Sequence, residues 1–304
     1  MFARITAALA SILVASCATA PVGDAPLPGP KDPQAFLETC EDWDDWAKPA
    51  PPFQILGNSW YVGTCGISAV LITGEQGHIL IDSGVENAAA HVLANIRELG
   101  FEPEDVQYLL MSHEHFDHIG GHAAITEATG AQVVASAAAA SVLRSGVVDK
   151  ADPQALSNHP DMAPVSVSKI MGDGDLIELG PIKIMAHTTP GHTPGAISWT
   201  WNACNLAGEP PICRRIAYVD SLSPVSSDAY RFSDHPEYLA HFRASIAKVR
   251  DLPCDLLVTP HPSSGKMIAK MRDGTFGLPS ACEEYAEALG AALDRRLVKE
   301  RNGG

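Results

Sequence analysis

The sequence is poor in basic residues and contains neither a C-x-x-C pair nor a low-complexity tract. Its 304 residues include 21 lysines and arginines against 36 acidic residues, which gives a net charge of −15. Because a nucleic-acid partner requires a basic face, we expect no such partner. Without a C-x-x-C spacing, a cysteine-based zinc knuckle is not expected either. The length and the 46% hydrophobic content suffice for one large domain with a substantial core.

The N-terminus has the features of an export signal. The apolar run Ile5–Val14 follows a basic residue and, at about ten residues, is too short for a mature bilayer span, which needs roughly 20. Val14–Cys17 is typical of a bacterial lipobox, whereas an ordinary cleavage site at Ala18–Ala20 would leave Pro21 as an unsuitable first residue. We therefore favour residues 1–16 as a lipoprotein signal peptide, an acylated Cys17, and a periplasmic protein anchored to the outer membrane through Cys17.

The cysteine count supports this interpretation. Seven cysteines leave one over in an exported chain, and an acylated Cys17 accounts for it. Six cysteines can pair in an oxidising periplasm, and the most local arrangement is Cys40–Cys65, Cys204–Cys213 and Cys254–Cys282. The alternative is that some of them are buried thiols.

Short strands and helices interleave from residue 53 onward, which predicts sheets covered by helices in the α/β class. Strands are expected at 53–56, 59–62, 67–73, 78–82, 106–111, 132–135, 175–178, 182–186, 196–201, 215–219 and 255–258, and helices at 87–99, 122–129, 136–144, 235–250 and 280–299. Residues 17–48 are expected to form a tether and N-terminal extension, because residues 18–35 are rich in Pro, Ala and Gly. Residues 49–304 are expected to form a single domain.

The strongest functional signal is a His-x-His-x-Asp-His pattern directly after the strand predicted at 106–111. Its members are His113, His115, Asp117 and His118. Alternate side chains of an extended loop share a face, so His113, His115 and Asp117 can point the same way. Where the chain begins to turn, His118 can join Asp117 on a neighbouring ion. Imidazole and carboxylate are ligands that zinc accepts, and ordinary surface or core histidines would rarely cluster so tightly.

Four ligands in one loop do not complete two zinc sites, so the others must come from elsewhere. His192 lies in a turn with Pro and Gly on both sides, and His261 lies between two prolines after a predicted strand. His187, at a strand end, is the rival of His192. The remaining histidines are expected to be structural or exposed (His78, His91, His159, His235 and His241), with His122 at a helix start.

Together, His-x-His-x-Asp-His, Gly-His-Thr-Pro-Gly and the late strand-end histidine resemble the metallo-β-lactamase superfamily from about residue 50 onward. The stretches 60–64, 79–84, 218–224 and 259–262 are similar, more narrowly, to class B, subclass 3 (B3) metallo-β-lactamases. The resemblance implies an αβ/βα four-layer sandwich with a dizinc site at one edge between two sheets. It also implies that the first zinc is held by His113, His115 and His192, and the second by Asp117, His118 and His261.

Ser221 indicates the subclass. In the other β-lactamase subclasses a cysteine ligates the second zinc at this place, and many non-lactamase relatives have a bridging aspartate there. The subclass 3 pattern implies instead that Ser221 and Ser223 bind the carboxylate of the antibiotic. Asp220 leaves a bridging ligand open as an alternative, although strand neighbours face opposite sides. Asp82 is expected either to support the metal ligands or to form a strand-end turn.

The resemblance implies zinc-dependent hydrolysis of the β-lactam amide bond of penicillins, cephalosporins and carbapenems, which confers antibiotic resistance. A zinc-bound hydroxide would attack the lactam, with Asp117 as the catalytic residue that orients it. The alternative is another zinc hydrolase of this fold acting on a thioester or lactone, which the expected export disfavours. A lipid-anchored binding protein with a degenerate site is disfavoured by the intact ligand set. We expect two Zn²⁺ per chain, a small-molecule β-lactam partner, a monomer, and membrane contact only through the lipid.

Overall fold

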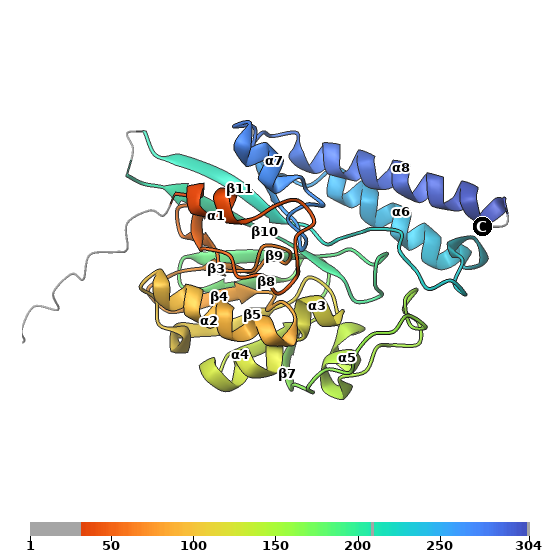
Figure 1. The fold of residues 1–304 in the computed structure, drawn as a ribbon, viewed down its shortest axis with the longest axis horizontal. Helices are drawn as coiled ribbons and strands as arrows, with labels where there is room; N and C mark the ends of the chain where they lie inside the picture. Colours follow the sequence, from red (N-terminus) through yellow and green to blue (C-terminus); the bar gives the residue numbers. More distant parts are fainter. Residues whose placement is uncertain (1–31, 208–209, 303–304) are drawn as a thin grey trace, which may run out of the picture.

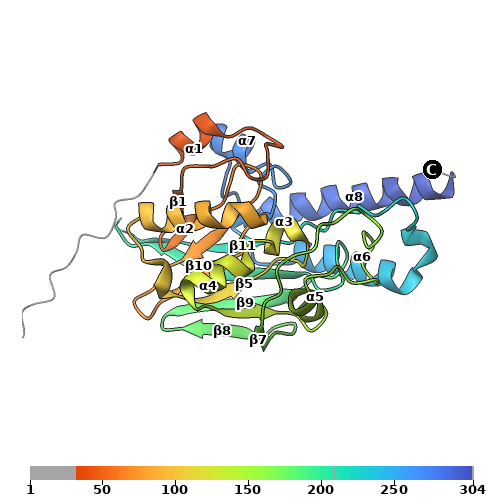
Figure 2. The same ribbon diagram turned by 60° about the horizontal axis from the view of Figure 1, so that its bottom comes forward.

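The computed structural model describes residues 32–207 and 210–302. The expected signal peptide and the expected acylation site at Cys17 lie outside these residues. Two sheets lie face to face, with helices on both outer sides, so the described chain has four layers (Figures 1 and 2). The first sheet has seven strands in the order β1-β2-β3-β4-β5-β6-β7, and the second has five in the order β12-β11-β10-β9-β8. This is the α/β sandwich expected from the sequence.

The strands of the first sheet are β1 (Phe53–Leu56), β2 (Ser59–Tyr61), β3 (Val70–Ile72), β4 (His78–Ile81), β5 (Val106–Leu110), β6 (Gln132–Ala135) and β7 (Val167–Ile170). Those of the second are β8 (Leu176–Leu179), β9 (Ile182–Thr188), β10 (Ile197–Asn205), β11 (Ile212–Tyr218) and β12 (Leu256–Val258). The α-helices are α1 (Gln34–Thr39), α2 (Ala89–Glu98), α3 (Phe116–Ile119), α4 (His122–Thr129), α5 (Ala139–Ser145), α6 (Pro236–Arg250), α7 (Met267–Arg272) and α8 (Ala281–Arg301), with 3-10 turns at Glu86–Ala88, Pro103–Asp105 and Phe232–Asp234.

The layers follow from the alternation of apolar side chains along the strands. In β4, Ile79 and Ile81 pack toward the second sheet, in one cluster with Trp199, whereas Leu80 belongs to the cluster beneath α2, α4 and α5. The outer face of the second sheet is covered by α6 and α8, which are seen side by side in Figure 1. The central strands of both sheets are therefore removed from water on both faces, which is the main stabilising contribution to such a sandwich.

Several elements differ from the sequence-based expectation. β7 was not predicted because Ser168, Lys169 and Ile170 are exposed and give no alternating pattern. β10 and β11 extend beyond the strands expected at 196–201 and 215–219, and Cys204 and Cys213 are paired across their ladder. The helices α1, α3 and α7 were also missed, since each is only four to six residues long.

The N-terminal extension packs onto the domain from residue 32 onward. Phe36 of α1 is buried, and its ring lies 4.9 Å from that of Phe53 and 5.0 Å from that of Tyr61. The structure joins Cys40 to Cys65, Cys204 to Cys213 and Cys254 to Cys282, which is the local pairing expected from the sequence. Among the described helices, none has the length and apolar content to cross a bilayer.

Five strand ends meet at one edge of the sandwich. β4 and β5 are parallel to each other in the first sheet, and β11 is parallel to β12 in the second. At this edge the backbone N–H of Ile197 donates to the carbonyl of Ser112 at 2.7 Å, and Trp199 Nε1 donates to the carbonyl of Met111 at 2.9 Å. These bonds join the two sheets beside the His-rich loop, so the loops that follow β4, β5, β9, β11 and β12 converge there.

Candidate metal centre

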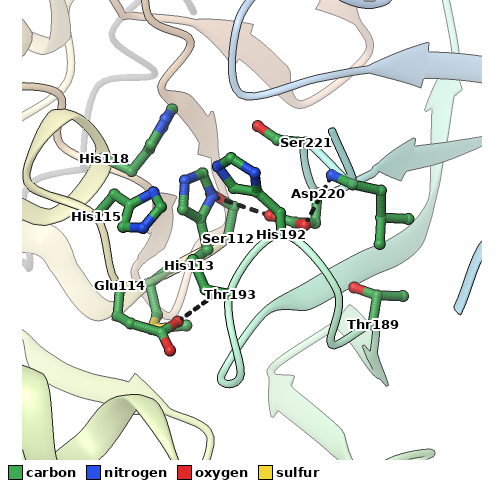
Figure 3. A network of polar contacts seen from close by, with 12 residues as sticks. Ser112, His113, Glu114, His115, His118, Thr189, His192, Thr193, Asp220 and Ser221 are labelled. Carbon is green, nitrogen blue, oxygen red and sulfur yellow. Dashed lines mark hydrogen bonds and ion pairs between the residues drawn. The ribbon is translucent and has the colours of Figure 1, made fainter. Parts of the chain in front are cut away.

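The histidines singled out in the sequence gather at this edge. The side chains of His113, His115 and His192 form one group, and those of His113, Asp117 and His118 form another; within each group the ligand atoms all lie within 4.8 Å of one another. Figure 3 shows the rings of His113, His115 and His192 close together, brought there from the loops after β5 and β9. All of these side chains are buried. The three-dimensional arrangement thus unites residues up to 79 positions apart in sequence.

His261 reaches the same cluster from the loop after β12. Its Nε2 lies 3.3 Å from Asp117 Oδ2, and its ring centroid lies 4.9 Å from that of His118. The same Asp117 oxygen lies 2.9 Å from His118 Nε2. Asp117, His118 and His261 therefore surround one small space, beside the three-histidine group.

In the three-histidine group, each imidazole is held by the protein through one of its two nitrogens. His113 Nδ1 lies 2.9 Å from Asp220 Oδ1, and His115 Nε2 lies 3.0 Å from Asp152 Oδ2. Such contacts fix the ring and its tautomer and leave the opposite nitrogen to face a metal ion. His113 Nε2, the nitrogen left over, is buried without a hydrogen-bond partner among the described residues.

His192 and His261 follow the same rule. His192 Nδ1 lies 3.0 Å from the carbonyl oxygen of Ser223, and His261 Nδ1 lies 3.3 Å from the carbonyl oxygen of Gly66. The two nitrogens of buried His118 also lack a hydrogen bond of normal geometry among the described residues. A buried polar atom left unpaired costs about 1–3 kcal/mol, and a metal ion removes that cost. The donor set and its orphaned nitrogens therefore fit a zinc-type cation.

The electrostatics hold two of the histidines in the neutral form and Asp117 in the ionised form. Burial, reinforced by His118, His192 and His115, holds the pKa of His113 well below its usual value. Burial, followed by the charge of His115, lowers the pKa of His192 to about 3. Both imidazoles are thus neutral at neutral pH, the form that binds metals. Burial would raise the pKa of Asp117, but His118 and His261 hold it well below its usual range, so this carboxylate is ionised.

Asp82 supports the His-rich loop from behind. Its Oδ1 accepts from the backbone N–H of Ser112 at 2.6 Å, and its Oδ2 accepts from the hydroxyls of Ser112 at 2.7 Å and Tyr218 at 2.8 Å. The same oxygen lies 3.5 Å from His118 Nδ1. Asp82 also has a φ of 60°, so it turns the chain at the end of β4. Both expectations for Asp82, support of the ligands and a strand-end turn, are met by one residue.

The glycines after the motif allow the ligand loop to pack tightly. A Cβ on Gly120 would lie 2.3 Å from the carbonyl oxygen of Phe116, and one on Gly121 would lie 2.7 Å from that of Ser83. Only glycine tolerates such approach of backbone to backbone. α3 begins at Phe116, so Asp117 lies on a helical turn and not on the extended chain that the sequence suggested. His118 lies on the same turn, where the chain was expected to begin to turn.

Some histidines lie outside the metal-ligand groups. His187, the rival of His192, contacts Thr200 Oγ1 at 2.8 Å within the second sheet. His122 begins α4, as expected, and its Nδ1 lies 2.8 Å from Ser83 Oγ. His159, expected to be structural or exposed, lies beside the cluster, and its ring centroid lies 4.8 Å from that of His115.

Two tryptophans from the N-terminal extension form a wall beside His261. Trp46 and Trp43 have ring centroids 5.6 Å and 6.4 Å from that of His261, and their side chains are 40% and 71% exposed. Exposure of large apolar side chains next to a buried polar cluster is typical of a ligand-binding site. Neither this wall nor the Asp152 contact was predicted, because both depend on long-range folding of loops that lack a motif.

Comparison with solved structures decides the family. The MIM-2 metallo-beta-lactamase is 48% identical to this chain, with a TM-score of 0.83, over 88% of this chain and 97% of that chain. The chain belongs to the metallo-β-lactamase superfamily. The family model described as "Metallo-beta-lactamase superfamily" matches residues 62–202. MEM-A1, a subclass B3 metallo-beta-lactamase from a soil metagenome library, is 40% identical with a TM-score of 0.80, over 86% of this chain and all of that chain.

A relative that is named as a different hydrolase matches a smaller part of this chain. A hydroxyacylglutathione hydrolase of Anaeromyxobacter dehalogenans (strain 2CP-C) is 31% identical over 130 residues. The match covers 43% of this chain and only 40% of that relative. The likeness to subclass B3 structures extends over a much larger part of the chain, and the resemblance to subclass B3 expected from the sequence is confirmed.

Asp220 lies behind the metal-ligand groups of this metallo-β-lactamase-superfamily chain. Its Oδ1 faces His113 Nδ1, its Oδ2 accepts from the backbone N–H of Leu222 at 3.1 Å, and its own N–H donates to Ser198 Oγ at 3.0 Å. Burial raises the pKa of Asp220 to about 7. The contact with His113 Nδ1 favours a residue that orients this ring, and the bridging metal ligand stays the alternative to be tested.

Proposed function

We propose that this chain is a zinc-dependent β-lactamase of subclass B3, which hydrolyses the amide bond of penicillins, cephalosporins and carbapenems and so confers antibiotic resistance. The observation that carries the proposal is the convergence of three loops on one buried cluster, in which the free imidazole nitrogens and one carboxylate share a small space. The substrate is a small molecule, and the chain acts as a monomer.

The residues that would hold two zinc ions divide into the two predicted sets. His113, His115 and His192 hold the first ion, and Asp117, His118 and His261 hold the second. When bound, zinc polarises a carbonyl group and activates water at neutral pH. Asp220 and Asp152 keep the rings of His113 and His115 in the orientation that this requires.

Asp117 is the residue placed to orient the attacking water. Its carboxylate is ionised, lies within 3.3 Å of both His118 and His261, and is grouped with His113 of the first set. In the reaction the water oxygen bonds to the lactam carbonyl carbon, the C–N bond breaks, and the ring nitrogen takes a proton. The product is a carboxylate and an amine, and no covalent bond to the protein is formed.

Ser221 and Ser223 are proposed to receive the carboxylate of the antibiotic. Ser221 Oγ is buried and has no hydrogen-bond partner among the described residues, so it can donate to a substrate. Ser223 has a second task, because its carbonyl and hydroxyl oxygens both lie 3.0 Å from His192 Nδ1. A substrate carboxylate bound by Ser223 would thus lie beside a first-zinc ligand.

The tryptophan wall is expected to contact the apolar side chain of the antibiotic. Replacing Trp43 by alanine should raise KM about fivefold for a β-lactam with an aromatic side chain and leave kcat nearly unchanged, because one aromatic contact is worth about 1 kcal/mol. Steady-state kinetics measure this, with Leu206→Ala as the control, since Leu206 is exposed beyond the far end of β10. An equal effect on a substrate with a methyl side chain would contradict the assignment.

Export is part of the proposed function. Residues 1–16 would be removed, and Cys17 would carry the lipid that anchors the protein to the outer membrane, facing the periplasm. Three disulfides among the described residues fit an oxidising compartment. Mass spectrometry of the mature N-terminus tests this proposal, because an unmodified N-terminus at any other residue would contradict it.

Hydrolysis of nitrocefin, with and without a chelator, tests the function itself. We expect steady turnover that is abolished by dialysis against the chelator and restored by two equivalents of Zn²⁺. Hydroxyacylglutathione and an N-acyl homoserine lactone, assayed in parallel, should be hydrolysed far more slowly. Faster turnover of either of these than of any β-lactam would reject the proposal in favour of the thioesterase or lactonase alternative.

A further inference from the structure

Glu114 is a buried carboxylate that the proposed reaction does not use. It lies between His113 and His115 in the motif, and because alternate side chains face opposite sides, it points away from the metal-ligand groups (Figure 3). Its side chain is 1% exposed, and no lysine or arginine among the described residues forms an ion pair with it. An isolated buried carboxylate is costly, so its hydrogen bonds must account for its presence.

The hydrogen bonds of Glu114 all reach the second ligand loop. Oε2 accepts from the hydroxyl of Thr193 at 2.6 Å, and Oε1 accepts from the backbone N–H of Gly195 at 2.7 Å. Thr193 directly follows His192, so both contacts grip the turn that carries the third ligand of the first zinc. Glu114 therefore joins the loop of His113 and His115 to the loop of His192. Glu114 is adjacent in sequence to two of the ligands, and its partner Thr193 is adjacent to the third.

The turn is also held from its other side. The carbonyl of Gly195 accepts from Ser136 Oγ at 2.8 Å, and Ser136 Oγ in turn accepts from the N–H of Ala139 at the start of α5. A Cβ on Gly195 would lie 2.7 Å from Glu114 Oε1 and 2.6 Å from the backbone nitrogen of Ala139. The turn thus fits tightly between Glu114 and α5. Without the hydrogen bonds to Glu114, Gly195 would be held only on the α5 side.

We infer that Glu114 is a positioning residue, which fixes the distance between the two loops and thereby preorganises the three-histidine zinc site. The inference rests on the proposed function only in requiring a metal at this cluster. The three histidines come from two separate loops, and a ring displaced by a fraction of an ångström no longer meets the other two at one ion. The hydroxyl of Thr193, which donates to Glu114, is needed for the same positioning.

Zinc affinity is the measurement that tests this inference. Replacing Thr193 by valine removes the hydroxyl at nearly constant volume, and we expect the affinity of the first site to fall about 10–100-fold, as for other residues that support metal ligands. Thr193→Ser retains the hydroxyl and should bind zinc like the parent. Glu114→Gln should resemble Thr193→Val, because its amide group can accept from only one of the two donors.

The matched control is Thr126→Val in α4. Thr126 Oγ1 is buried but has no hydrogen-bond partner among the described residues, so its loss should leave zinc binding unchanged. Affinities are measured by competition with a chromophoric chelator on the full chain, together with the thermal midpoint of each metal-free protein. The d–d spectrum of the Co²⁺ form reports ligand geometry, which a purely structural effect on folding would not alter.

The results separate this inference from the function. If Thr193→Val binds zinc and displays the Co²⁺ spectrum of the parent, or if Thr193→Ser is as weak as Thr193→Val, Glu114 does not position the site. If the parent binds two zinc ions but leaves β-lactams intact, the proposed function fails. The role of Glu114 is then still decided by the zinc affinities and Co²⁺ spectra of the variants. Should Glu114→Gln not fold, the two Thr193 variants decide the question.

Discussion

Replacing His118 by alanine is expected to lower kcat/KM for a carbapenem about 10³-fold and to reduce bound zinc from two ions to one per chain. His118 Nε2 and His261 Nε2 share Asp117 Oδ2 as a neighbour, at 2.9 Å and 3.3 Å, so removal of one imidazole opens the second site. The loss of about 4 kcal/mol of charge stabilisation in the transition state corresponds to that factor.

The first site should survive this substitution. His113, His115 and His192 are oriented by Asp220, Asp152 and the carbonyl of Ser223, and none of these contacts involves His118. Elemental analysis gives the zinc content, and steady-state kinetics give the rate. His241→Ala is the control, because His241 is an exposed residue of α6. A His118→Ala protein that retains two zinc ions and the parental rate would contradict the ligand assignment.

Replacing Asp220 by alanine is expected to weaken zinc binding at the first site and to lower kcat/KM, each about 10–100-fold. Asp220 Oδ1 faces His113 Nδ1, so the alanine variant removes this contact and leaves the nitrogen with only the longer, 3.2 Å contact to Ser112 Oγ. Asp220→Asn should lose less, because its side-chain oxygen can still accept from His113 Nδ1. Zinc titration against a competing chelator, with parallel kinetics, measures both effects.

The same pair of variants distinguishes the two roles considered for Asp220. A bridging ligand would donate to both ions, so Asp220→Ala would then release both, and Asp220→Asn would be nearly as damaging. A residue that orients His113 predicts retention of the second ion in both variants. Loss of two zinc ions from Asp220→Asn would therefore overturn the interpretation drawn from the contacts of Asp220.

The sequence predicted the parts of the site that depend on local patterns. His113, His115, Asp117 and His118 lie within six residues after a buried strand, so the expected positions needed no knowledge of the tertiary fold. His192 and His261 could be found because prolines and glycines fix their turns. Sheets covered by helices followed from the interleaved strands and helices, and the four-layer arrangement followed from the resemblance to the metallo-β-lactamase superfamily. A strand such as β4 alternates between the two cores as this arrangement requires.

The residues that were not predicted act at long range. Asp152 lies 37 positions from His115 in an irregular loop with no motif, yet its Oδ2 is 3.0 Å from His115 Nε2. Trp43 and Trp46 reach His261 only because α1 packs under β1 and β2 and Cys40 is joined to Cys65. The role of Glu114 could not be inferred from the motif either, since its partners are 79 and 81 positions away.

The metal ligands and the residues that border them lie on different segments, and this separation has a consequence for how such an enzyme evolves. The metal ligands lie on short loops after strands of the two sheets, whereas Trp43, Trp46 and His159, which border the cluster, lie on segments that supply no metal ligand in the proposed sets. Mutations in those segments can change the side chains that border the metal site and leave the geometry of the metal ligands intact. Selection by a new antibiotic would therefore act first on these bordering segments, with little loss of folding stability.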